Sequence, residues 1–199
     1  MEELTVFWKT RQKCNLVIVL INCLVFLVLS ILGDPGNGSF MLQYGADYAP
    51  FVLEKGEYFR LFTSMFLHFS LQHLAYNMLM LIFMGDILEK HVGKLRYLAI
   101  YLGGGLAGNL LSVFWAWHTQ SYAISAGASG AIFAVTGALL FYVLFRKNRI
   151  PELSGKRLVL LIVLNVLEGI TAQGIDNLAH IGGLAGGFLL TALLNLERI

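Results

Sequence analysis

The stretch CNLVIVLINCLVFLVLSIL, residues 14–32, decides the class of this protein. Its length of about 19 residues, none of them charged, is what an α-helix needs to cross the hydrocarbon core of a bilayer. Lys9, Arg11 and Lys13 precede it, as they would in a signal peptide. However, the apolar run exceeds the roughly 7–15 residues of such a peptide, and the following GDPGNGS offers no A-x-A-like cleavage site. We therefore predict a retained first transmembrane helix.

Composition extends this prediction to the whole chain. Of its 199 residues, 57% are hydrophobic and 13% are charged, whereas about 25% are charged in a typical soluble domain. The formal net charge of +2 gives no reason to expect a nucleic-acid partner. Cys14 and Cys23 lie on the same predicted helix, too far apart to form a disulfide. We predict an all-α membrane protein.

Six segments are long and apolar enough to be transmembrane helices, at about 20 residues a span. They are residues 14–32, 70–88, 95–117, 128–145, 157–173 and 177–196. Asn165 and Glu168 interrupt the fifth. The only long connection, residues 33–69, is rich in aromatic and apolar residues, which favours a place at the membrane interface. We predict a cytoplasmic N-terminal segment, residues 1–13, and a compact six-transmembrane-helix domain, residues 14–199, with a long interfacial first loop.

Positive charges predict the orientation of the chain. Of the 14 Lys and Arg residues, only Lys55 and Arg60 lie in the long first loop. The others precede the first span, follow the sixth, or lie between spans two and three and spans four and five. Because positive residues are enriched on the cytoplasmic side, both termini are expected in the cytoplasm and the first loop outside. Trp115 and Trp117 then lie at the outer interface, where aromatic side chains gather.

Small residues in two of the later spans predict close helix packing. Gly104 and Gly108 in the third span, and Gly183 and Gly187 in the sixth, have Gly-x-x-x-Gly spacing. This spacing lets transmembrane helices approach closely. By themselves, these glycines indicate a compact bundle and no chemistry.

Four polar residues within the spans need a further explanation, because such residues are costly in a membrane. His73 and Asn77 are four residues apart and share one face of the second span. Ser129 opens the fourth span and His180 lies one turn into the sixth. Each of these two precedes the next charged residue by 17 positions, which places both about 25 Å above the cytoplasmic boundary. Serine and histidine are therefore expected at one depth, slightly below the outer surface.

These residue types can perform acyl transfer. A serine hydroxyl becomes a nucleophile when a base takes its proton, and histidine is the commonest base. The Asn77 amide, the His73 ring and the backbone N–H of Ser129 can donate to a developing oxyanion. Gly127 and Gly130 would let a substrate backbone come close.

The residues alone leave other roles open. Each polar residue has an alternative role in hydrogen bonding between packed helices. A hydrolase and a transporter with a polar midplane site stay equally open, although no inverted repeat is visible.

The motifs resemble those of the rhomboid intramembrane serine proteases, in order and across nearly the whole chain. HLAYN (73–77) resembles the H-x-x-x-N of the second helix in that family, and GDILEKHVG (85–93) resembles the G-x-x-x-E-x-x-x-G that follows it. GASG (127–130) resembles the G-x-S-G nucleophile motif. AHIGGLAGG (179–187) resembles A-H-x-x-G-x-x-x-G in the sixth helix.

This resemblance implies a rhomboid-like bundle and an intramembrane serine endopeptidase. Ser129 would be the nucleophile and His180 the general base, then general acid. Asn77, His73 and the Ser129 N–H would form the oxyanion hole. Supporting positions would be Gly127, Gly130, Phe133, Gly183 and Gly187.

The resemblance also implies what the protein acts on. Substrates would be other transmembrane proteins in the lipid bilayer, cleaved in or near their membrane segments, with no cofactor or metal. No organelle-targeting feature is visible, which suits a bacterial plasma membrane. A relative that has lost catalysis is the main rival, and the presence of both Ser129 and His180 disfavours it.

Three positions qualify the resemblance. Phe59-Arg60 replaces the Trp-Arg pair of the family, which bears on how the first loop is anchored. His68 corresponds to a histidine near the active-site mouth of some members, and we expect an interfacial polar residue. Asp176, four residues before His180, is either a triad acid or a cap of the last helix. The cap is favoured, since the family uses a Ser–His dyad.

Overall fold

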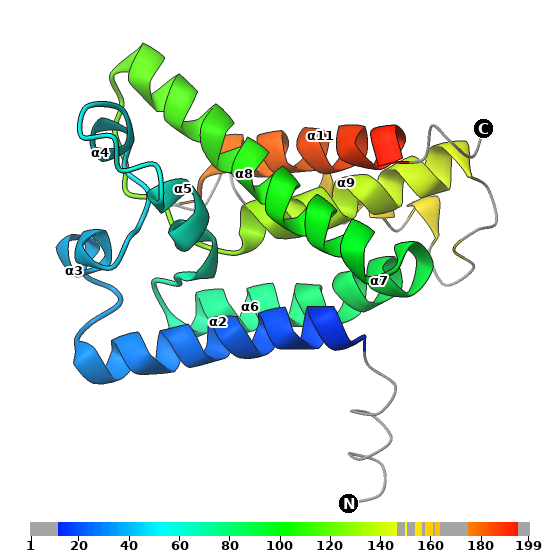
Figure 1. The fold of residues 1–199 in the computed structure, drawn as a ribbon, viewed down its shortest axis with the longest axis horizontal. Helices are drawn as coiled ribbons and strands as arrows, with labels where there is room; N and C mark the ends of the chain where they lie inside the picture. Colours follow the sequence, from blue (N-terminus) through cyan, green and yellow to red (C-terminus); the bar gives the residue numbers. More distant parts are fainter. Residues whose placement is uncertain are drawn as a thin grey trace, which may run out of the picture.

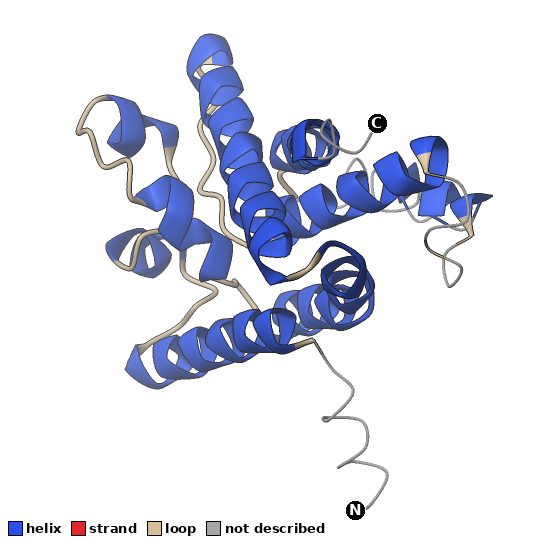
Figure 2. Cartoon of the chain, turned by 45° about the vertical axis from the view of Figure 1, so that its right-hand side comes forward, coloured by secondary structure: helices blue, strands red, loops and turns tan. Residues whose placement is uncertain are grey.

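The computed structural model describes residues 12–146, 150, 154–156, 158–160, 162–163 and 175–194. In this part of the chain, regular structure is helical apart from one isolated bridge between Asp47 and Ser125 (Figure 2). The helices are α2 (Lys13–Leu32), α3 (Gly38–Gln43), α4 (Ala49–Leu53), α5 (Arg60–Thr63), α6 (Leu71–Met80), α7 (Asp86–Val92), α8 (Lys94–Thr119), α9 (Ser129–Phe145) and α11 (Asn177–Leu194).

Five of the predicted spans correspond to helices in the structure (Figure 1). Four described helices are long and apolar enough to cross a membrane, namely α2, the continuous run Leu71–Val92, α8 and α11. α9 is apolar but shorter, with 17 residues. The remaining predicted span, residues 157–173, lies mostly outside the described residues, as does the predicted N-terminal segment. An all-helical membrane protein is therefore confirmed, and the count of six helices stays a prediction.

α2 directs its two asparagines inward and many of its apolar side chains outward. Asn15 and Asn22 are buried, whereas apolar residues of the same helix are exposed, among them Val17, Leu20, Leu24, Leu27 and Ile31. A helix at the surface of a soluble protein has the opposite pattern. The arrangement suits a helix surrounded by lipid, in which exposed polar groups would be costly.

α8, α9 and α11 approach one another through glycines. A Cβ on Gly108 would collide with the carbonyl oxygen of Ala179, and one on Gly187 with that of Ala134. Backbones this close leave no room for a side chain between them. The predicted close packing of the later spans is confirmed, and it brings the starts of α9 and α11 together.

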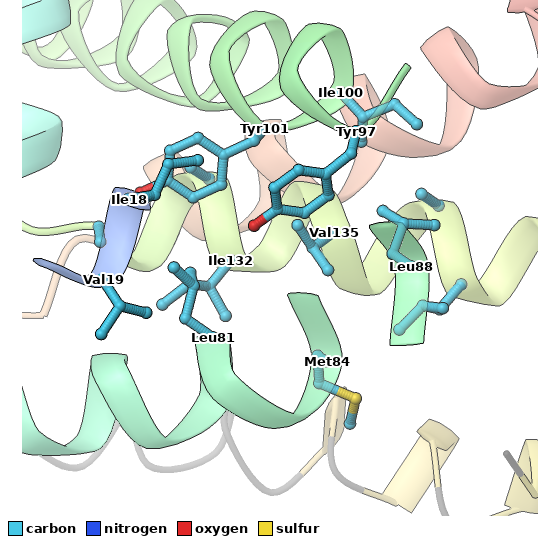
Figure 3. Packing of buried hydrophobic residues seen from close by; sticks show 14 of the residues in the cluster. Ile18, Val19, Leu81, Met84, Leu88, Tyr97, Ile100, Tyr101, Ile132 and Val135 are labelled. Carbon is cyan, nitrogen blue, oxygen red and sulfur yellow. The ribbon is translucent and has the colours of Figure 1, made fainter. Parts of the chain in front are cut away.

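The core is centred on two tyrosines of α8. The Tyr97 and Tyr101 side chains are fully buried and point into a cluster that includes Ile18, Leu81 and Ile132 (Figure 3). These residues come from α8, α2, α9 and the π-helical turn Leu81–Gly85 between α6 and α7. One cluster therefore joins the N-terminal helices to the glycine-packed group.

The 85–93 motif ties the second span to the first. Glu89 accepts hydrogen bonds from the backbone N–H groups of Cys14 (3.2 Å) and Asn15 (2.7 Å), so a carboxylate lies at the N-terminus of α2. Asn15 donates to the Leu81 carbonyl at 2.8 Å and accepts from the Tyr97 hydroxyl at 2.7 Å. A hydrogen-bonded network thus fixes the position of α2 against the π-helical turn and α8.

Arg60 anchors the first loop from inside. Its guanidinium is buried and donates to the carbonyls of Leu42 (2.7 Å) and Ala46 (2.9 Å), and it pairs with Glu57. Phe59, at the position of the family tryptophan, is largely exposed. The loop is therefore held by the arginine of the pair even though its aromatic partner differs.

Candidate active site

Ser129 and His180 meet where the start of α9 faces the first turn of α11. Ser129 is the first residue of α9, and His180 is the fourth residue of α11. The helices can approach because a side chain is lacking at Gly183, where a Cβ would collide with the carbonyl oxygen of Gly130. His180 Nε2 lies 2.8 Å from Ser129 Oγ, a hydrogen-bonding distance, although 51 residues separate them in sequence. The two residues expected at one depth are in direct contact.

Packing holds the His180 ring in place. The Phe133 ring stacks on it, with centroids 4.3 Å apart and planes inclined by 11°. The His180 side chain is 7% exposed, and its Nδ1 has no hydrogen-bond partner among the described residues. In that part of the chain, therefore, the ring is oriented by stacking and by Ser129, and no carboxylate contacts Nδ1.

Asp176 caps α11. Its Oδ1 accepts from the N–H of Ala179 at 2.9 Å, which is the contact of an N-cap side chain with the third helical residue. Its Oδ2 accepts from the Ser112 hydroxyl at 2.6 Å. The predicted cap is confirmed. Both carboxylate oxygens have partners other than the His180 ring, so the geometry does not support a triad.

Gly127 occupies a position that only glycine fits. Its φ of +147° is one that residues with a side chain rarely adopt. A Cβ there would lie 2.9 Å from His73 Nε2 and 3.6 Å from Ser129 Oγ. The glycine therefore lets the second-span histidine lie beside the serine.

Hydrogen-bond donors lie beside Ser129. Asn77 is buried, and its Nδ2 has no partner among the described residues. Ala128 precedes α9 and has no side-chain acceptor to cap it, so the first backbone N–H groups of the helix, including that of Ser129, are left for another acceptor. An oxyanion is the kind of group that such donors stabilise.

A cavity of about 850 Å³ contains these groups. Its wall includes His73, Asn77, Ser129 and His180. Apolar side chains line the same cavity, including Met80, Met84 and Ile162. The polar groups can bind a reacting peptide group, and the apolar lining can contact hydrophobic side chains next to it.

His68 is buried, contrary to the expectation of an interfacial residue. Its side chain is 0% exposed, and its ring meets the His73 ring edge-on at 5.0 Å between centroids. Burial lowers the pKa of His68 to about 3, so the ring is neutral at physiological pH. The neutral Nε2 accepts a hydrogen bond of 3.5 Å from the N–H of Ala128. His68 supports the loop that leads into Ser129 because that loop passes directly over it.

Sequence reasoning missed two polar residues of α8, Asn109 and Ser112. Asn109 is buried and donates to Ser64 Oγ, and Ser112 contacts Asp176. The signal that singled out His73 and Asn77, a polar residue inside a predicted span, was present for both.

The fold and the site define a helical membrane protein with a serine–histidine pair in an internal cavity. A family model for the Rhomboid domain matches residues 55–196. The chain is 34% identical over 196 residues to rhomboid protease GluP of Bacillus subtilis (strain 168), covering 98% of this chain and 38% of GluP. It is 31% identical over 200 residues to rhomboid protease AarA of Providencia stuartii, covering 89% of this chain and 70% of AarA.

The chain belongs to the rhomboid family and is a multi-pass membrane protein. A third relative, putative rhomboid protease YdcA of Bacillus subtilis (strain 168), is 38% identical over 138 residues and supports the same assignment. The chain spans little more than a third of the length of GluP.

Proposed function

We propose that this protein is an intramembrane serine endopeptidase that cleaves other transmembrane proteins in or near their membrane segments. The observation that carries the proposal is the 2.8 Å contact between His180 Nε2 and Ser129 Oγ inside a cavity. Membership of a family whose matched relatives are named as proteases supports it.

The reaction proceeds through a Ser–His dyad. Ser129 Oγ attacks the scissile carbonyl carbon while His180 Nε2 takes the hydroxyl proton. When the tetrahedral intermediate collapses, the C–N bond breaks and His180 gives that proton to the leaving amine. A water molecule then attacks the acyl-enzyme ester with His180 again as base, which releases the acid product and restores the Ser129 hydroxyl.

The negative charge that develops on the substrate oxygen is stabilised by hydrogen-bond donors. These are the Asn77 amide, the His73 ring and the backbone N–H of Ser129 at the start of α9. The buried Asn77 Nδ2 without a partner among the described residues supports this role, because its donor capacity is free for the oxyanion.

The substrate segment must be extended at the scissile bond, since a carbonyl within an intact helix is already hydrogen-bonded. Helix-destabilising residues near the cleavage site should therefore favour cleavage. As the family resemblance implies, the segment would enter past the predicted fifth span and the first loop, and Ile162 of that span lines the cavity. Water would enter from the outer side, in a six-helix arrangement with both termini in the cytoplasm.

The proposal is tested with purified protein, in detergent or liposomes, and a model transmembrane substrate. We expect the wild type to cleave it and both Ser129→Ala and His180→Ala to lose at least about 10³-fold in kcat. Each variant must melt at the wild-type temperature for its result to count. Cleavage that survives in Ser129→Ala would contradict the mechanism. A wild type that cleaves none of several substrates would favour a relative that has lost catalysis.

A further inference from the structure

α8 contains two polar residues that the proposed mechanism does not use. Asn109 and Ser112 are three residues apart and so lie on one face of the helix. Asn109 is buried and Ser112 is half-buried. Each donates a hydrogen bond to a side chain outside α8, Asn109 to Ser64 and Ser112 to Asp176. Polar side chains inside a transmembrane helix need a hydrogen-bond partner. The partners of Asn109 lie in the first loop, and the partner of Ser112 lies just before α11. We refer to them as the α8 polar pair.

Asn109 connects α8 to the backbone that carries the nucleophile. Its Nδ2 donates to the carbonyl of Leu61 at 2.7 Å and to Ser64 Oγ at 3.0 Å. The Ser64 carbonyl in turn accepts from the N–H of Gly127 at 2.9 Å. Gly127 lies two residues before Ser129, so one residue, Ser64, joins Asn109 to the loop that positions the nucleophile.

Ser112 connects α8 to the helix that carries the base. Its hydroxyl donates to Asp176 Oδ2 at 2.6 Å. The other oxygen of Asp176 accepts from Ala179 N at 2.9 Å, and the Asp176 carbonyl accepts from His180 N at 3.2 Å. Again one residue, here Asp176, joins α8 to a catalytic side chain.

We propose that Asn109 and Ser112 are positioning residues, and that α8 is the common support that sets the relative position of Ser129 and His180. The inference rests on the proposed function. It follows from how α9 and α11 meet: where Gly183 approaches Gly130 the contact is between backbones, which by itself does not fix how far one helix slides along the other. Directional hydrogen bonds to a third helix supply that restraint, and a misplacement of about 1 Å can lower a rate about 100-fold.

Two matched pairs of variants test the connection through Ser112. Ser112→Thr keeps the hydroxyl, whereas Ser112→Val has the shape of threonine but no hydroxyl. In Asp176→Asn the amide oxygen can still accept from the N–H of Ala179 as the cap. The amide NH2 can then donate to the Ser112 hydroxyl, which accepts as well as donates. Asp176→Ser keeps a capping oxygen but has no second oxygen for Ser112.

The readouts are the rate of Ser129 labelling by a saturating fluorophosphonate, kcat and KM for a transmembrane substrate, and the melting temperature. We expect Ser112→Val and Asp176→Ser to lower labelling and kcat by about 10- to 100-fold, with KM and melting temperature close to wild type. Ser112→Thr and Asp176→Asn should keep most of the activity.

Double variants separate the two connections. Ser112→Val combined with Asp176→Ser breaks a single connection twice, so the pair should be no slower than the worse single variant. Ser112→Val combined with Asn109→Leu breaks both connections, so the fold losses should multiply.

Wild-type kcat and labelling in Ser112→Val would overturn the inference while leaving the proposed function intact. So would a fall in melting temperature that parallels the loss of activity, because the role would then be structural. If Asp176→Asn were as slow as Asp176→Ser, the charge of Asp176 would act on His180 directly and the positioning role would be wrong. A wild type that is neither labelled nor active would overturn the proposed function, and this inference with it.

Discussion

Gly127 shows how one residue without a side chain sets the geometry of the site. Its backbone conformation and the nearness of His73 both require glycine. Gly130, three residues on, has neither restriction, because a Cβ there would only come within 3.4 Å of the Ala179 carbonyl oxygen. The two glycines of the G-x-S-G motif therefore differ in what they contribute.

Gly127→Ala is expected to lower kcat and Ser129 labelling by more than about 10-fold, because the new Cβ displaces His73 and strains the backbone. Gly130→Ala is the matched control and should lose much less. Labelling kinetics and melting temperature measured on both variants check this. Equal activity in the two variants would show that the positions are equivalent.

Asp47 is expected to make the stability of the fold depend on pH. It is buried beside the loop that leads to Ser129, and its backbone pairs with that of Ser125. Burial, with the Asp176 carboxylate nearby, raises the pKa of Asp47 to about 7 from an ordinary value of 3.8. The folded protein thus holds a proton that the unfolded chain has already released between these two values, so Asp47 lowers the stability increasingly as pH rises from 4 to 7.

Asp47→Asn should therefore raise the melting temperature by several degrees at pH 8 and leave it nearly unchanged at pH 4. Above pH 7 the difference between variant and wild type should level off, since Asp47 is then ionised in both states of the wild type. Thermal unfolding in detergent across this pH range measures it. A difference that is the same at every pH would show that ionisation of Asp47 is not the cause.

At the scale of elements, the described helix ends lie within a few residues of the predicted spans, because apolar length follows bilayer thickness. The fourth predicted span, 128–145, and α9 differ by one residue at the start. The second was predicted to end at 88, yet the helical run continues to Val92 and contains the π-helical turn Leu81–Gly85. No sequence pattern predicted that turn. It coincides with a contact between distant residues, the hydrogen bond from Asn15 to the Leu81 carbonyl.

Close helix contacts at glycine are a feature of α8, α9 and α11. Gly183→Ala should lower the melting temperature by several degrees and the activity with it, because its Cβ would meet the Gly130 backbone, which cannot move aside. Gly103→Ala is the control, since its Cβ would meet only the flexible end of Leu190. Thermal unfolding of both variants distinguishes them, and a stable Gly183→Ala would contradict the role of this contact.

At the scale of the molecule, the distribution of Lys and Arg predicts both termini in the cytoplasm. Green fluorescent protein fused after Ile199 should fluoresce, and alkaline phosphatase fused there should be inactive. Alkaline phosphatase fused after Gln120, in the connection between α8 and α9, should be active. Phosphatase activity at Ile199 would reverse the predicted orientation.

The sequence by itself determined the class of protein, five of the helices and the residues of the candidate site. Apolar length and polar exceptions within spans are local properties, so Ser129, His180, His73 and Asn77 could be singled out without coordinates. Motif order then identified the family resemblance.

Only the tertiary structure decided what these residues touch. It set the 2.8 Å contact of Ser129 with His180, assigned the oxygens of Asp176 to a cap and to Ser112, and buried His68. The physical reason is that the contacts of a side chain between two helices depend on how closely, and in what register, the two backbones approach. That approach is set here by glycines distant in sequence, whose spacing predicts that helices come close but not which helices meet.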